Sequence, residues 1–345
     1  MVSDKHIERN AHGRIKRSDF SPAFWATNRH VQTIWPRFLM RRPKVEVRHE
    51  KVTTPDGDFV DLAWSSKPEQ SKGLVVIFHG LEGSIRSHYA NDTMAALYKQ
   101  GWQVVLMHFR GCSGEPNHTT RTYHSGDTRD ARFILERLRK QFPNDFMVAI
   151  GFSLGGNMLL KLLGENPLQK WLHSACVISA PLKLAECSSS INQGFSRVYQ
   201  KYLLASMRRT LLTKMRTLDY SAEPQITQAK IRALKTFREF DDLVTAPLHG
   251  YQDAIDYYEK CSGFNFLQAI RTPTLILHAK DDPFMNENVI PEEVDLARAV
   301  TLELSDRGGH VGFMQGTPWR PVIWFHQRVL TFLETQRGQL LAKSR

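Results

Sequence analysis

A serine flanked by two glycines is the residue whose surroundings most clearly indicate chemistry. The segment Gly151-Phe152-Ser153-Leu154-Gly155 follows an apolar run typical of a buried strand and precedes a run typical of a helix. The glycines leave room for a sharp strand-to-helix turn, which strains the serine backbone and exposes its hydroxyl. The start of the helix adds positive potential that stabilises a nearby anion. The sequence therefore predicts Ser153 as a nucleophile, and the alternative is an idle serine in a tight turn.

A serine hydroxyl is a weak nucleophile until a neighbouring base removes its proton. Of the 14 histidines, His310 has the most suggestive position. It lies in Asp306-Arg307-Gly308-Gly309-His310-Val311-Gly312, a glycine-rich stretch after the last expected strand, where a loop could bring an imidazole over the edge of a sheet. His310 is therefore the candidate base, and the alternative is a loop histidine without a catalytic role.

The third group would be a carboxylate that holds the imidazole in the required tautomer without taking its proton. The stretch Leu275–Phe284 ends a strand and offers two neighbouring candidates, Asp281 and Asp282. Adjacent side chains of an extended segment point to opposite sides, so only one of them can face the histidine. Loops that follow such a strand often place the acid three residues after the small residue that ends the strand, here Ala279. This count favours Asp282, with Asp281 as a solvated or salt-bridged neighbour.

A tetrahedral oxyanion intermediate needs two backbone N–H donors. One would come from Leu154, directly after the nucleophile. The other would come from the loop His79-Gly80-Leu81-Glu82-Gly83, which follows an apolar strand and turns sharply at its first glycine. Leu81 is the expected donor there, and the alternative is an ordinary strand-ending turn.

These groups must be positioned by a regular scaffold, and short apolar runs alternate with helical segments along the chain. Such alternation predicts an α/β fold with a mostly parallel sheet that is covered by helices on both faces. The expected strands are Val45–Thr53, Phe59–Ser65, Leu74–Phe78, Gln103–Phe109, Phe146–Phe152, Ala175–Ala180, Thr274–His278 and Val300–Leu304. The expected helices are Asn91–Gln100, Thr128–Gln141, one that begins at Leu154, and Val322–Thr335.

The alternation stops between residues 183 and 262, which are helical in period and basic. We therefore predict a catalytic core of residues 44–182 and 263–345, with a helical cap, residues 183–262, inserted between the sixth and seventh expected strands. The segment Tyr202–Met215 of this cap separates apolar from cationic faces and would roof the pocket. Residues 1–43 lack a sustained period and are expected to form an irregular arm that packs its aromatic residues Trp25, Trp35 and Phe38 onto the core.

Positive charge is concentrated in the predicted cap. The 345-residue chain has a formal net charge of +11. The stretch between Arg197 and Arg238 contains ten Lys or Arg residues and only two acidic residues. A solvated helical face explains this pattern, but a basic patch can also attract nucleic acid, anionic lipid or an acidic substrate. No nucleic-acid-binding motif is present, so no nucleic acid partner is expected. Peripheral contact of the cap with a membrane surface stays open.

The remaining composition indicates an intracellular enzyme without cofactors. The four cysteines lie far apart without metal-binding spacing, and the polar N-terminus lacks a secretory apolar region, so we expect a cytoplasmic protein. No apolar run is long enough for a spanning helix. Nucleotide-binding motifs are absent, and His118 and His124 lack carboxylates at metal-ligand spacing. We therefore predict neither a cofactor nor a metal.

Five motifs in this order resemble the α/β-hydrolase superfamily: HGLEGS, FRGCSG, GFSLGGN, DDPF and GGHVGF. Within it, residues 20–335 resemble the YheT-like branch through Phe109–Gly114, Phe240-Asp241-Asp242 and His249-Gly250-Tyr251. The resemblance implies the α/β-hydrolase fold and a serine esterase or related acyltransferase whose triad is Ser153, Asp282 and His310.

The expected activity is cleavage of short- to medium-chain or lipid-like carboxylic esters through an acyl-enzyme. Two alternatives remain. An acyltransferase would pass the acyl group to an alcohol or lysolipid instead of water. A protein of another class would keep the hydrolase fold only as a non-catalytic module for binding membrane surfaces.

Overall fold

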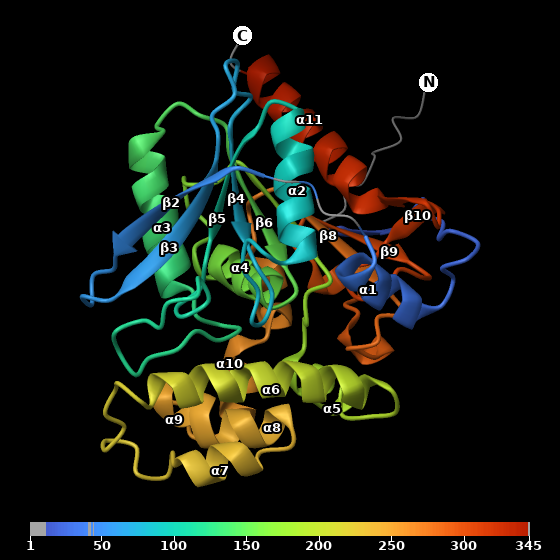
Figure 1. The fold of residues 1–345 in the computed structure, drawn as a ribbon. Coiled ribbons are helices and arrows are strands. Elements are labelled where there is room, and N and C mark those ends of the chain that lie inside the picture. The colour runs from blue at the N-terminus through green and yellow to red at the C-terminus, as the bar shows by residue number, and fades with distance from the viewer. Residues whose placement is uncertain (1–11, 41–42, 44, 344–345) are drawn as a thin grey trace, which may run out of the picture.

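A large twisted sheet runs through the centre of the protein (Figure 1). The computed structural model describes residues 12–40, 43 and 45–343. Within them the sheet has nine strands in the order β1-β9-β8-β7-β6-β4-β5-β3-β2. The β2–β3 and β3–β5 pairs are antiparallel and the other pairs are parallel. The strands are β1 (Arg14–Arg17), β2 (Val47–Thr53), β3 (Phe59–Ser65), β4 (Leu74–Phe78), β5 (Gln103–Met107), β6 (Met147–Phe152), β7 (Ser174–Ile178), β8 (Thr274–Ala279) and β9 (Val300–Ser305).

Helices cover both faces of this sheet, and each face has its own apolar core. Helices α3 (Arg129–Gln141) and α4 (Leu154–Glu165) pack on one face, and α2 (His88–Lys99) and α11 (Trp324–Lys343) pack on the other. Because side chains alternate along a strand, Val76 of β4 belongs to the first core and Val75 to the second. Central strands buried on both faces explain the uninterrupted apolar runs of the sequence. The expected α/β fold is confirmed.

The N-terminal residues are more regular than expected. They form β1, which pairs with β9, and helix α1 (Arg29–Phe38), so the prediction of an irregular arm was wrong. The Asn28 side chain caps α1 by accepting hydrogen bonds from two backbone amides. Pro36 lies inside this helix, and an interior proline argues against a helix in the sequence. Trp25 and Trp35 pack on the core as predicted, whereas the Phe38 side chain is 63% exposed. Residues 1–11, 41 and 42 of the predicted arm lie outside the described residues.

The C-terminal segment also differs from the prediction. The expected final helix at Val322 is preceded by a hairpin of β10 (Met314–Thr317) and β11 (Arg320–Ile323), so α11 begins at Trp324. Gly316, with φ of 81°, provides the left-handed residue of this hairpin. At its other end α11 continues eight residues beyond Thr335, because a single interior glycine costs a helix only about 1 kcal/mol.

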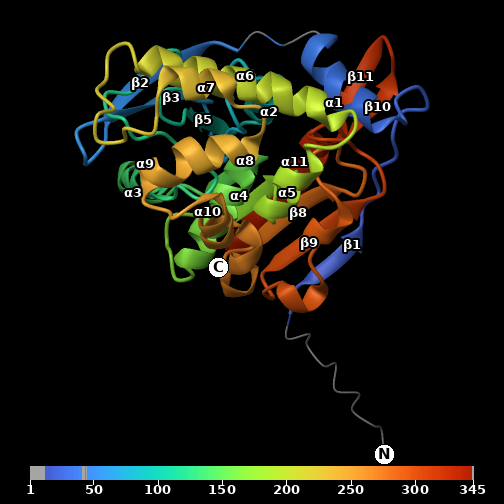
Figure 2. The same cartoon turned by 90° about the horizontal axis from the view of Figure 1, so that it is seen from below.

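Residues 183–262, called the helical segment below, lie between β7 and β8 and form a layer beyond the carboxyl ends of the parallel strands (Figures 1 and 2). They have a small apolar core of their own that includes Leu204, Leu211 and Ile231. The helices of this segment are α5 (Leu184–Ser190), α6 (Ser196–Lys214), α7 (Gln228–Ala233), α8 (Phe237–Phe240), α9 (Ala246–His249) and α10 (Ala254–Cys261), with the π-helical turn η1 (Asp241–Thr245) between α8 and α9.

A buried arginine joins the β2–β3 hairpin to α3. The Arg110 side chain is 1% exposed and donates hydrogen bonds to Asp56, Asp58 and Asp130. Burial opposes ionisation of Asp58, but hydrogen bonds from Thr119, Asn117 and two backbone amides outweigh it and lower the pKa of Asp58 to about 2. Arg110 is therefore engaged by the protein's own carboxylates.

Replacing Arg110 with leucine should destabilise the fold by about 3–5 kcal/mol, because it leaves buried carboxylates without their counter-charge. Urea unfolding measures this loss. Arg17→Leu is the matched control: the Arg17 side chain is 86% exposed in its ion pair with Asp306, and such a pair contributes at most about 1 kcal/mol. Equal destabilisation by the two substitutions would contradict the importance of the buried network.

Candidate active site

Ser153 occupies the sharp turn between β6 and α4. Its φ is 49° and its ψ is −119°, a strained conformation for a residue with a side chain. The flanking glycines make the turn possible. A methyl group at Gly155 would lie 2.4 Å from the His79 carbonyl oxygen, and one at Gly151 would lie 2.7 Å from the Gly155 carbonyl oxygen. The serine is thus raised above the carboxyl end of β6, where it lines a cavity.

The structure brings Ser153, His310 and Asp282 together from three distant parts of the chain. His310 Nε2 lies 3.0 Å from Ser153 Oγ, and His310 Nδ1 lies 2.7 Å from Asp282 Oδ2. Since a carboxylate only accepts hydrogen bonds, Nδ1 donates to Asp282 and the lone pair of Nε2 faces the serine hydroxyl. Asp282 is 1% exposed, so water hardly competes for this contact. The arrangement can remove the serine proton as Oγ attacks a carbonyl carbon.

The loop that carries His310 is held from several sides. The His310 amide donates to Thr33 Oγ1 of α1 at 3.0 Å, and the Gly309 amide donates to Asp281 Oδ1 at 2.9 Å. The Phe284 ring stacks on the imidazole with centroids 4.0 Å apart. The two aspartates therefore have different contacts: Asp282 accepts a hydrogen bond from the His310 ring, and Asp281 accepts one from the backbone of the loop that carries it. Asp281 was expected to be solvated or salt-bridged; instead it is half-buried and accepts a backbone hydrogen bond.

The two expected oxyanion donors, Leu81 and Leu154, also line the cavity beside Ser153. Throughout the described residues, neither backbone amide donates to a protein acceptor, so both remain available to a ligand. The buried His79 shapes this region: it accepts a hydrogen bond from the Phe109 amide at 3.0 Å and contacts the Gly80 carbonyl. Burial, with the neighbouring His108, lowers the pKa of His79 to about 3, which keeps its ring neutral.

Glu82 connects the Leu81 loop to the helical segment. Its φ is 52°, an uncommon value for a non-glycine residue. Its amide donates to the Tyr123 hydroxyl, and its carboxylate accepts hydrogen bonds from Tyr123 and from Ser206 and Thr210 of α6 at 2.8–3.0 Å. The backbone that presents the Leu81 amide is thereby tied to both neighbouring layers.

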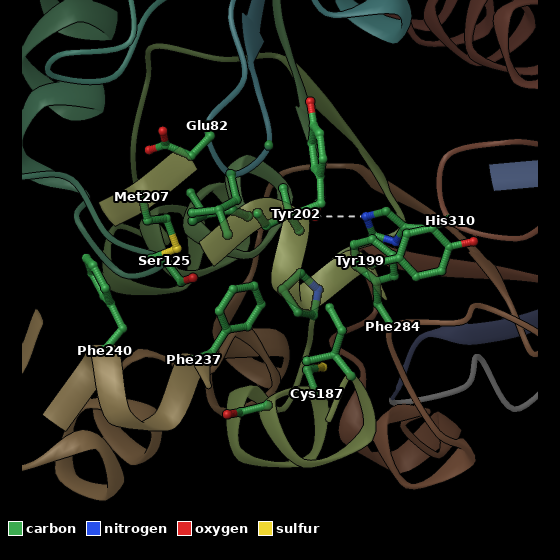
Figure 3. A pocket seen from close by; sticks show the side chains of 18 of the residues that line it. Glu82, Ser125, Cys187, Tyr199, Tyr202, Met207, Phe237, Phe240, Phe284 and His310 are labelled. Atoms are coloured by element: carbon green, nitrogen blue, oxygen red, sulfur yellow. Dashed lines mark hydrogen bonds between the residues drawn. The ribbon is translucent and has the colours of Figure 1, made fainter. Parts of the chain in front are cut away.

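The cavity has a volume of about 380 Å³ and lies between the carboxyl ends of the strands and the helical segment. Figure 3 shows His310 with Tyr199 and Phe284 on one side and Met207, Phe237 and Phe240 on the other. Most of its wall is apolar, with further contributions from Leu184, Ile191 and Leu203. Such a wall suits a hydrocarbon chain placed against the serine.

Sequence reasoning missed the residues that support the site: Thr33, Phe284 and Glu82. Phe284 and Glu82 stand inside motifs that had been recognised, so their positions were visible but their contacts were not. Thr33 gave no signal, because its contact with His310 spans 277 residues of sequence.

Comparison with known proteins supports the fold and the class of the protein. Residues 73–317 match the family model described as the alpha/beta hydrolase fold. The chain is 46% identical over 320 residues to the "Putative esterase YheT" of Escherichia coli (strain K12), covering 92% of this chain and 94% of that protein. It is 28% identical over 279 residues to the monoacylglycerol lipase of Saccharomyces cerevisiae, covering 80% of this chain and 62% of that one.

Among solved structures, the esterase Pf2001 of Pyrococcus furiosus superposes with a TM-score of 0.54 at 17% identity, over 85% of this chain and 92% of that chain. At this identity the likeness concerns the fold. The chain belongs to the α/β-hydrolase fold family. Within that family it is a YheT-like protein, as the resemblance in the sequence predicted.

Proposed function

We propose that this carboxylic ester hydrolase acts through an acyl-enzyme formed on Ser153. His310 takes the serine proton as Oγ attacks the ester carbonyl and then delivers it to the leaving alcohol. Asp282 orients the imidazole and stabilises its charged form. The amides of Leu81 and Leu154 hold the oxyanion. The observation that carries the proposal is the continuous contact from Asp282 Oδ2 through His310 to Ser153 Oγ.

We further propose water as the acyl acceptor and the helical segment as the cap over the site. Phe38, Val198 and Tyr202 line the cavity and are exposed, so the cavity opens to solvent and water can reach an acyl-enzyme. Short- to medium-chain or lipid-like esters fit the apolar wall. The protein is expected in the cytoplasm, and no helix of the described residues has the length and hydropathy to cross a membrane.

The direct test is to trap the intermediate. The purified enzyme is mixed with p-nitrophenyl esters of graded chain length, quenched in acid and digested for mass spectrometry. An acyl mass on the peptide that contains Ser153, followed by free acid as the main product even with added alcohol, supports the proposal. An acyl group on another residue would contradict the assigned nucleophile, and a dominant ester product would favour acyl transfer.

Replacing Met207 with tryptophan should shorten the accepted acyl chain, because Met207 lies in the cavity wall formed by α6. We expect kcat/KM for long-chain esters to fall about tenfold or more while acetyl ester turnover changes by no more than about twofold. Lys201→Trp is the matched control, since Lys201 is exposed on the same helix and does not line the cavity. A uniform loss across all chain lengths would contradict a role of Met207 in chain selection.

A further inference from the structure

The mouth of the cavity lies where α1 meets α6. Of all the described residues that line the cavity, only three are exposed: Phe38 at 63%, Val198 at 55% and Tyr202 at 53%. Phe38 ends α1, and the other two belong to the first half of α6. A hydrogen bond of 2.6 Å from Arg37 Nη2 to the Tyr202 hydroxyl joins the two helices at this point. The entrance is therefore rimmed by large apolar side chains that face solvent.

The exposed apolar rim continues along one side of α6 into a cationic surface. Residues spaced three or four apart share one face of a helix. Along α6 and its ends, one such series is exposed at every position: Phe195, Val198, Tyr202, Ala205, Arg209, Thr213 and Arg216. The first half of this stripe is mostly apolar, with Phe195 52% exposed, and the second half carries arginines.

A second hollow on the protein surface lies beside the cationic half of the stripe. It is formed by α6 and α7 and contains four arginines: Arg208, Arg209, Arg216 and Arg232. Arg208 donates to backbone carbonyls of Arg232 and Leu234, and Arg232 donates to the Gln228 side chain. In the described part of the chain, none of the four lies within ion-pairing distance of a carboxylate. Arginine favours phosphate oxygens because its planar donors match them.

We propose that the exposed stripe of α6, with Phe38 and the arginine hollow, docks the cavity mouth on an anionic lipid surface. The apolar half would enter the boundary between headgroups and acyl chains, while the arginines would bind lipid phosphates beside it. An ester held in the bilayer would then enter the cavity without crossing water. Only this last step rests on the proposed function, because the binding itself does not require turnover.

Other partners fit the surface less well. A nucleic acid would neutralise the arginines but would leave Phe38 and Val198 in water. A second copy docked through this face by a twofold axis would place the same arginine cluster on both sides of the interface, where like charges repel. An anionic bilayer meets both halves of the stripe at once, since it offers phosphate groups and hydrocarbon within a few ångströms of each other.

The test uses the full chain with Ser153→Ala, so that turnover cannot alter the lipid. The protein is sedimented with vesicles of phosphatidylcholine alone or mixed with phosphatidylglycerol, at low and high salt. We expect binding to the mixed vesicles that salt weakens. Arg209→Gln with Arg216→Gln should reduce the affinity about 30-fold. The matched control is Arg271→Gln with Arg298→Gln, which removes the same charge from exposed positions just before β8 and β9, at the amino ends of these strands. This control should bind vesicles like the parent.

The apolar half is tested separately. Phe38→Ser with Val198→Ser should also release the protein from mixed vesicles, whereas Leu168→Ser with Val294→Ser, at exposed positions before β7 and β9, should not. With Ser153 restored, the Arg209/Arg216 variant should hydrolyse a soluble short-chain ester at the parental rate but lose activity on vesicle-borne ester. If the unsubstituted protein bound vesicles but did not hydrolyse the soluble ester, only the proposed function would be refuted.

Three results would overturn the docking proposal. The first is that the protein does not bind mixed vesicles, or that the two control pairs weaken its binding as much as the Arg209/Arg216 and Phe38/Val198 pairs do. The second is salt-sensitive binding of an RNA oligonucleotide by the same arginines without vesicle binding. The third is a concentration-dependent dimer that the Phe38/Val198 pair disrupts while vesicles are not bound.

Discussion

Ester hydrolysis by the Ser153→Ala variant should fall by about 10⁶-fold in kcat, to the level that binding and the oxyanion donors alone can maintain. Within the described residues the hydroxyl is the hydrogen-bond partner of His310 Nε2, and alanine removes the atom that would form the acyl bond. A fluorophosphonate probe measures the same loss independently of substrate choice, because it labels only an activated serine. The variant should remain unlabelled.

The control for this substitution is Ser189→Ala, at an exposed position in α5. It should keep full labelling and full turnover. If the Ser153→Ala protein were labelled as strongly as the parent, another nucleophile would be responsible and the assignment of the site would fail. Thermal unfolding of the two variants separates loss of chemistry from loss of fold.

Substitutions of the adjacent aspartates should give the second large loss of kcat, and the informative quantity is the difference between the losses at Asp282 and Asp281. Asp282→Asn should lower kcat by about 10⁴-fold, because an amide can donate to Nδ1 and so favours the tautomer in which Nε2 carries the proton. Asp281→Asn should lower it by at most about tenfold, since the asparagine oxygen can still accept the hydrogen bond from the Gly309 amide.

Steady-state kinetics on one short-chain ester suffices for this comparison. A larger defect for Asp281→Asn than for Asp282→Asn would mean that the loop contact, and not the contact with the imidazole, limits the reaction. Equal defects would show that the two carboxylates act as a unit, against the division of roles that their contacts indicate.

The sheet and the nucleophile turn were predictable because their signals are local. Buried parallel strands read as short apolar runs, and the glycines beside Ser153 are required by contacts within a few residues of the turn or with the neighbouring strand. The preference for Asp282 over Asp281 followed from the strand end at Ala279, which the structure places where the apolar run ends. The geometry of these parts depends on patterns that a single stretch of sequence contains.

The surroundings of the site were not predictable for the opposite reason. Glu82 reaches Ser206 and Thr210 across more than 120 residues, and nothing near any of these positions announces the contact. Helix α1 was missed because Pro36 lowers helix propensity, while its support comes from Gln32, which is fully buried and accepts a hydrogen bond from the Met314 amide. The contacts of Glu82 and the formation of α1 both depend on tertiary packing, which short-range sequence patterns do not contain.

The hydrogen bond between Thr33 and the His310 amide has a consequence for synthesis on the ribosome. Thr33 is synthesised 277 residues before His310, so the contact that holds the histidine loop can form only after both segments have been made. A nascent or prematurely terminated polypeptide that contains Ser153 but ends before residue 310 lacks the imidazole proposed to activate it. The proposed activity can therefore arise only after residue 310 and the loop around it have been synthesised.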